Sequence, residues 1–157
     1  MAFLPLAQTV IGADKWHGAT EVCSLDYDAR FLRRKTLTTD DGTRFLVDLS
    51  QTTSLTQGDI LPLSNGVYVK ISAAPEPVLQ ASGVNLPQLA WHIGNRHTPC
   101  QILPDALIIR DDPVIGHMLE HLGATLTKAM LPFTPEGGAY GHGRTHSHEH
   151  GKTAHDH

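Results

Sequence analysis

Residues 78–130 decide the fold and read VLQASGVNLPQLAWHIGNRHTPCQILPDALIIRDDPVIGHMLEHLGATLTKAM. Short apolar runs of strand length alternate here with two segments of helical spacing, and Gly or Pro residues separate them. The order β-α-β-β-α-β that this predicts is the split βαβ arrangement, in which two helices cover one face of a sheet. The predicted strands are 78–81, 101–103, 106–109 and 124–130, and the predicted helices are 86–93 and 113–122.

Polar and glycine residues mark the ends of both predicted helices. Asn85 is placed to cap the first helix, with Pro87 in its first turn, and Gly94 follows its end. Asp112 precedes Pro113 and is placed to cap the second helix, which Gly123 closes. These two helices and four strands of about 60 residues form a thin core, so a dimer that covers the open sheet face would stabilise it.

Residues 1–73 have a different character and read as β-rich. DDGT at 40–43 and SNG at 64–66 are strong hairpin turn signals between apolar runs. No stretch of helical period competes with them. We therefore predict an all-β domain, a small sandwich or barrel, at 1–73. The proline-containing segment 74–77 is predicted to be a linker.

Composition excludes several classes of protein. The chain has 157 residues, of which 40% are hydrophobic and 18% charged, so it suits one domain or two small ones. No apolar run reaches the roughly 18 residues of a membrane span. A net charge of −4 without a basic block gives no support to nucleic-acid binding. The first residues lack the basic start of a secretory signal, so we expect a cytoplasmic protein with reduced Cys23 and Cys100.

Histidine is the abnormal component. Of eleven histidines, six lie in the tail 141–157, which contains no large apolar residue. Such a segment cannot offset its chain entropy by burial, so we predict that it is disordered without metal. Neutral imidazoles suit Ni(II), Zn(II) and Cu(II), and a flexible segment lets several rings wrap one ion. The predicted tail ligands are His142, His146, His148, His150, His155 and His157.

Two interpretations of the tail without metal binding are less well supported. An expression tag would usually have six consecutive histidines, whereas here other residues separate them. A polar tail that only keeps the protein soluble is possible on composition alone. Metal binding is favoured, and it should fade as pH falls through roughly 6.5 because the rings must be unprotonated.

His97 is the second candidate ligand, in the predicted loop after the first helix. A single loop histidine is more often an ordinary surface residue than a ligand. A two-fold axis near this loop would change that, because His97 would then face its own copy. Two such rings make half a metal site, and the tail could supply the rest.

Three ordered motifs run through the second half of the chain. They are GNRHxPxQ at 94–101, MLxxLG at 118–123 and LPFxPExGAYG at 131–141, followed by the histidine-rich tail. Together they resemble the urease accessory protein UreE family, the nickel metallochaperones. The β-rich first half fits that family's peptide-binding domain, which is similar to a substrate-binding domain of the heat-shock co-chaperones.

The resemblance implies both a fold and a function. It implies a ferredoxin-like second domain at 78–140 that dimerises and binds nickel through His97 and its symmetry mate, completed by tail histidines. The homodimer would deliver Ni(II) to the urease apoprotein in a complex of urease accessory proteins that includes a GTPase. Some family members carry extra metal-binding histidines just before the second helix. This chain has RDDP at 110–113 instead, in which Asp111 could offer an oxygen ligand.

Three other candidate ligands have structural explanations. Cys100, three residues after His97, is as well explained as a small buried strand residue, and His117 and His121 as a solvated helix edge. Because the chain has no nucleophile elbow, phosphate loop or Cys-x-x-Cys pair, a carrier is favoured over an enzyme. The alternatives are a general Zn, Cu or Ni storage or buffering protein, and a peptide-binding chaperone module whose tail is incidental.

Overall fold

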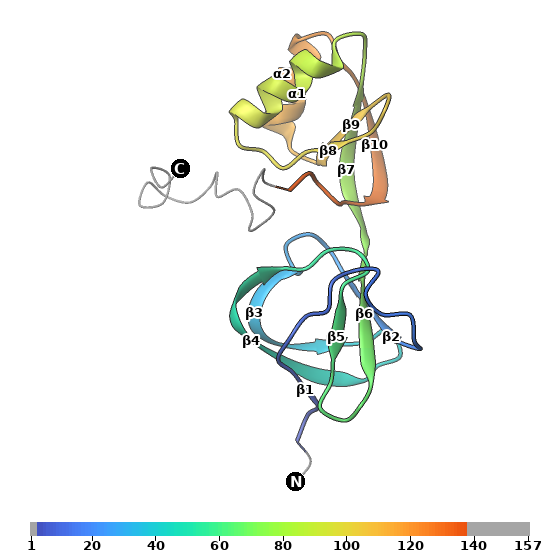
Figure 1. The fold of residues 1–157 in the computed structure, drawn as a ribbon. Coiled ribbons are helices and arrows are strands. Elements are labelled where there is room, and N and C mark those ends of the chain that lie inside the picture. The colour runs from blue at the N-terminus through green and yellow to red at the C-terminus, as the bar shows by residue number, and fades with distance from the viewer. Residues whose placement is uncertain (1–2, 138–157) are drawn as a thin grey trace. The chain divides into compact units, whose positions relative to one another are not determined.

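The computed structural model describes residues 3–137, and the predicted tail ligands lie outside this range. The chain divides into two compact units, Met1–Ala74 and Pro75–His157. Figure 1 shows the first unit as strands only and the second as a sheet with two helices. The predicted change of character after residue 73 is therefore seen in the structure.

The first unit contains two three-stranded sheets, ordered β1-β4-β3 and β2-β6-β5. Side chains from both sheets, among them Phe45 and Ile71, form one buried core, as expected for a sandwich. The strands are β1 (Leu6–Ala7), β2 (Glu21–Leu25), β3 (Phe31–Thr38), β4 (Arg44–Ser54), β5 (Ile60–Pro62) and β6 (Tyr68–Ala73).

Both predicted hairpin turns are present. Residues 40–43 join β3 to β4, and the turn containing Gly66 joins β5 to β6. Gly42 and Gly66 have φ values of +93° and +89°, which a residue without Cβ adopts at little steric cost. The sequence did not predict β1 and β2, which pair in parallel with β4 and β6. Parallel pairs join residues far apart in the chain, so no local turn signal marks them.

The second unit contains the predicted order β-α-β-β-α-β. Its four strands form an antiparallel sheet in the order β10-β7-β9-β8. The predicted linker at 74–77 is wrong for its last three residues, because β7 starts at Pro75 and pairs with β10 from there. The elements are β7 (Pro75–Ser82), α1 (Leu86–Asn95), β8 (Gln101–Ile102), β9 (Leu107–Arg110), α2 (Pro113–His121) and β10 (Thr125–Pro132).

Both helices pack on the same face of this sheet (Figure 1). Leu89 and Ile93 of α1 and Leu119 of α2 form a buried cluster with side chains of β7 and β9, including Leu79 and Ile109. The resulting two-layer unit leaves the ends of the helices exposed to solvent. No helix within residues 3–137 is long and apolar enough to cross a membrane.

The two helix starts differ from each other. Asp112 caps α2 as predicted, with its carboxylate accepting from the backbone N–H groups of Val114 and Ile115 at 2.9 and 3.1 Å. Asn85 precedes α1 but makes no side-chain capping bond, so that prediction is wrong. Its backbone has φ −116° and ψ 49°, which differs from the extended geometry of an Ncap residue.

Candidate metal centre

His97 is the first residue beyond the C-terminal cap of α1. The helix runs through Gly94 to Asn95, two residues past the predicted end at residue 93, and Arg96 caps it. The His97 N–H donates to the Gly94 carbonyl at 2.9 Å, and the N–H of Thr98 donates to the Ile93 carbonyl at 3.2 Å. This pair of bonds is the Schellman motif, which ends a helix by placing one residue in the left-handed region.

His97 is the residue in that left-handed conformation, with φ +56°. Glycine is the usual residue at this position, because a Cβ there costs roughly 1–2 kcal/mol. The side chain is exposed, on a backbone that the two helix-ending bonds hold in place. An imidazole at this point is therefore presented to solvent from a defined position.

The last described residues of the chain lie beside this loop. The Glu136 N–H donates to the carbonyl of Cys100 at 2.8 Å, three residues after His97. Figure 1 shows the orange chain after β10 running to the end of β8, where the loop from α1 enters. The described chain therefore ends next to the His97 loop, through a hydrogen bond that no local motif predicted.

Cys100 has the properties of a packed thiol. It is half-buried and packs against the core of the second unit. Burial, with a further contribution from the Glu136 charge, raises the pKa of the Cys100 thiol to about 11, although a backbone hydrogen bond at Ile108 acts in the opposite direction. The raised pKa disfavours the thiolate that a metal would bind, and together with the packing of Cys100 against the core it favours the structural interpretation.

The remaining candidate ligands do not come together within the described chain. His117 and His121 are both exposed on α2. Within residues 3–137 no three His, Cys, Asp or Glu side chains are grouped closely enough to hold a metal ion. His97 is predicted to share its ion with the six tail histidines and with a second copy of itself. The tail histidines lie beyond residue 137, and the second copy would come from a partner chain.

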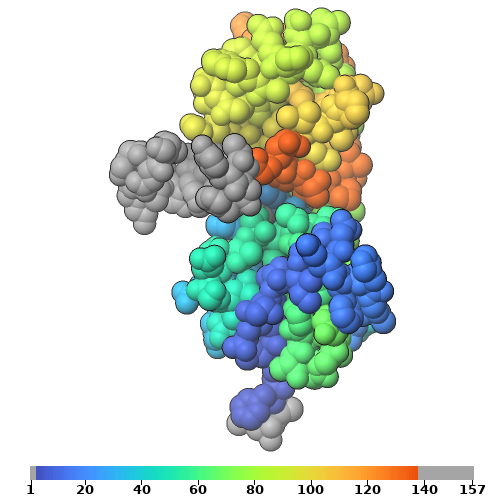
Figure 2. All heavy atoms as spheres, in the orientation of Figure 1, coloured from blue at the N-terminus to red at the C-terminus, as the bar shows by residue number. Residues whose placement is uncertain are grey.

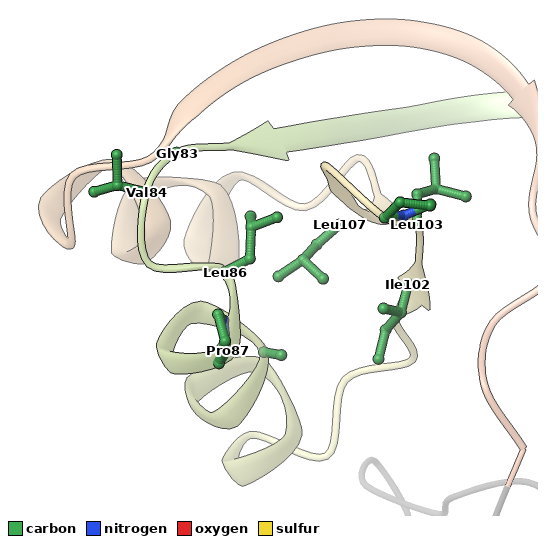
Figure 3. Close-up of a pocket in the computed structure, with 9 residues that line it drawn as sticks. Gly83, Val84, Leu86, Pro87, Ile102, Leu103 and Leu107 are labelled. Carbon is green, nitrogen blue, oxygen red and sulfur yellow. The ribbon is translucent and has the colours of Figure 1, made fainter.

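A separate apolar pocket lies between the start of α1 and the β8–β9 turn. Its cavity volume is about 440 Å³. Figure 3 shows Val84 and Ile102 at its opposite sides, with Leu86 and Leu107 between them. The lining has no imidazole, thiol or carboxylate, so this pocket offers no metal ligand. Its lining residues are Gly83, Val84, Leu86, Pro87, Ala90, Ile102, Leu103, Pro104 and Leu107.

Comparison with known proteins matches both units. The model of the UreE urease accessory protein C-terminal domain covers residues 71–157, and that of the N-terminal domain covers residues 7–74. The chain belongs to the UreE family. The family boundary, at residues 71–74, agrees with the boundary between the two units at Ala74.

Individual relatives support the same assignment. The urease accessory protein UreE of Ruegeria pomeroyi is 52% identical over 147 residues, which cover 94% of this chain and 99% of that protein. The Rhodobacter capsulatus protein of the same name is 50% identical over 151 residues, 96% of each chain. That of Ruegeria sp. (strain TM1040) is 62% identical over 122 residues, 78% of this chain and 69% of the relative. The UreE resemblance seen in the motifs is confirmed.

Proposed function

We propose that this protein is a cytoplasmic nickel metallochaperone of urease maturation, a carrier and not a catalyst. Histidines of the tail capture Ni(II), and His97 holds the ion together with its copy in a homodimer. The protein then delivers the metal to the urease apoprotein, with other accessory proteins that include a GTPase. Membership of the UreE family, whose relatives are named urease accessory proteins, supports this role.

One observation carries the site proposal. The hydrogen bond of 2.8 Å between the Glu136 N–H and the Cys100 carbonyl brings the base of the tail to the His97 loop. His142, the first tail histidine, follows Gly137 by five residues, a reach of at most about 18 Å for an extended chain. This reach would allow tail imidazoles and His97 to share one ion. Each bound ring raises the effective concentration of the next.

The fold supports the remaining parts of the proposal. The order β-α-β-β-α-β and the sheet order β10-β7-β9-β8 fit a ferredoxin-like domain. Exposure of His97 at the end of α1 fits a residue that meets its symmetry mate. A homodimer would then contribute two His97 rings, while the tail histidines would capture and release the ion. Imidazoles alone also bind Zn(II) and Cu(II), so general metal storage is the competing function.

Calorimetric titration with Ni(II) and Zn(II) tests the proposal on three proteins: the intact chain, a chain ending at Tyr140, and His97→Ala. We expect truncation to remove several sites and to leave one per dimer. His97→Ala should remove that remaining site. If all binding leaves with the tail and His97→Ala has no effect, the shared site is wrong and the protein is a tail-borne metal buffer.

Delivery requires a separate measurement. In cells that lack this protein, urease should be poorly activated at low external nickel, and the His97→Ala gene should restore activity less well than the wild-type gene. A storage protein would instead change the total metal content of the cell with no specific defect in urease.

A further inference from the structure

Residues 133–137, here called the crossing segment, connect β10 at one edge of the second sheet to β8 at the other. The sheet order β10-β7-β9-β8 places these strands at opposite edges. The segment nevertheless bonds to β8, because the Thr134 N–H donates to the Gln101 side-chain oxygen at 3.0 Å and the Glu136 N–H donates to the Cys100 carbonyl at 2.8 Å. It must therefore pass from one edge of the sheet to the other.

The crossing takes place on the face opposite the helices. Gln101 pairs with Ile108, and Ile108 with Gln80, so these three side chains form one row across the sheet. Their neighbours along the strands, Leu79 and Leu107, belong to the helix-facing core, and alternation places the row on the other face. Ile108 is only 2% exposed there, although neither α1 nor α2 covers that face.

The start of the crossing segment is firmly packed. Phe133 is fully buried at the beginning of the segment, directly after β10. Figure 2 shows the orange-red atoms of this part of the chain lying against the gold atoms of β8 and β9. The side-chain oxygen of Gln101 then accepts a partly buried hydrogen bond from the Thr134 N–H. The sheet thus guides the chain from Phe133 to the edge where the His97 loop begins.

We propose that Gln101 is a positioning residue for metal binding, which holds the base of the tail beside His97 by accepting the Thr134 N–H. This inference rests on the proposed function and adds a residue that touches neither metal nor tail histidine. Gln101 is four residues from His97, on the strand that follows the loop. Without this bond the backbone bond between Glu136 and Cys100 would be left to hold residues 134–137 on β8, so the segment would detach more readily after Phe133. The tail would then search a larger volume, so its effective concentration at His97 would fall.

Three substitutions separate positioning from general stability. Gln101→Leu removes the acceptor, Gln101→Glu keeps an oxygen acceptor, and Gln80→Leu is the matched control in the same row of the same sheet face. Each is titrated with Ni(II) in the full-length protein. We expect Gln101→Leu to weaken the His97-dependent site by about tenfold, and Gln101→Glu and Gln80→Leu to bind like the wild type.

Combination with His97→Gly shows whether Gln101 acts through the metal site. In that background only tail-borne binding remains, and Gln101→Leu should no longer change Ni(II) affinity. Amide hydrogen exchange in the metal-free protein should also be about tenfold faster at Thr134 and Glu136 in Gln101→Leu, with unchanged rates in α1.

Each alternative has its own outcome. An equal loss of affinity in both backgrounds, or a loss in Gln80→Leu as large as in Gln101→Leu, would mean that Gln101 merely stabilises the fold. Wild-type affinity in Gln101→Leu despite faster exchange at Thr134 would overturn the positioning role. If His97→Gly alone leaves Ni(II) binding unchanged, the proposed function fails independently of Gln101.

Discussion

His97 combines an exposed imidazole with a backbone conformation that most residues avoid. Its φ of +56° satisfies the Schellman bonds at the end of α1, and glycine would satisfy them at lower steric cost. Backbone strain of this kind is found where the side chain has a use that compensates for the loss of stability. The conformation therefore agrees with a functional role for this imidazole and provides a test that does not involve metal.

Replacement of His97 by glycine should relieve the strain, whereas alanine should keep it. We expect His97→Gly to have a free energy of unfolding about 1 kcal/mol higher than His97→Ala, since only alanine keeps a Cβ in the left-handed region. Urea denaturation of both metal-free variants measures the difference. Equal stability would show that the left-handed conformation at residue 97 has no energetic cost.

The same pair of variants refines the titration of the metal site. Both lack the imidazole, so both should lose the His97-dependent Ni(II) site to the same extent. A loss in His97→Ala alone would indicate that disturbed backbone geometry, and not the missing ligand, reduces binding.

At the scale of elements, the second unit depends on how its two helices begin. The Asp112 carboxylate accepts from two backbone N–H groups in the first turn of α2, while Asn85 makes no such bond at α1. Pro113 and Pro87 lie in the first turns of the respective helices. Because α2 contributes the buried Leu119 to the core, fraying at its start affects the packing of the whole sheet.

Removal of each candidate cap should have different consequences. Asp112→Ala should lower the free energy of unfolding by about 1 kcal/mol, because two backbone donors lose their acceptor. Asn85→Ala should change it by only a few tenths of a kcal/mol and serves as the matched control. Thermal or urea unfolding followed by circular dichroism measures both, and equal effects would contradict the capping difference.

At the scale of the molecule, two separate cores stabilise the chain. One buried cluster contains Phe45 and Ile71, and the other contains Leu89 and Leu119, with no residue in common. Each unit also has its own sheets, and strand pairing does not cross the boundary at Ala74 in the described chain. The candidate site, built on α1, β8 and residues 133–137, belongs entirely to the second unit.

A large cavity in one core should leave the other unit folded. Phe45→Ala should destabilise the first unit by about 3–5 kcal/mol, because the ring is fully buried. Amide exchange should then accelerate in β3, β4 and β6 but stay slow in β7 and β9. Equal acceleration in both units would show that they unfold as one, and Leu119→Ala provides the reciprocal experiment.

Local patterns in the sequence determined much of this protein. Turn residues at 40–43 and 64–66, the Asp112 cap and the alternation of apolar segments in 78–130 act over a few residues, so they could be read directly. His97 was identified as a candidate ligand in the same way, from a motif of eight residues. The predicted Asn85 cap is wrong because it depends on backbone geometry at residue 85. The predicted linker at 74–77 is wrong because it depends on strand pairing with β10, which lies far along the chain.

Only the tertiary structure decided where distant segments meet. The parallel partners of β1 and β2, the left-handed backbone of His97 and the return of residues 133–137 to Gln101 leave no periodic or turn signal in the sequence. Thr134 lies 33 residues after Gln101, and their bond forms because residues 133–137 return from β10 at one edge of the sheet to β8 at the other. The residue types proposed to bind metal are thus written in the sequence, whereas the position of residue 136 beside the segment that follows His97 is a product of the folded sheet.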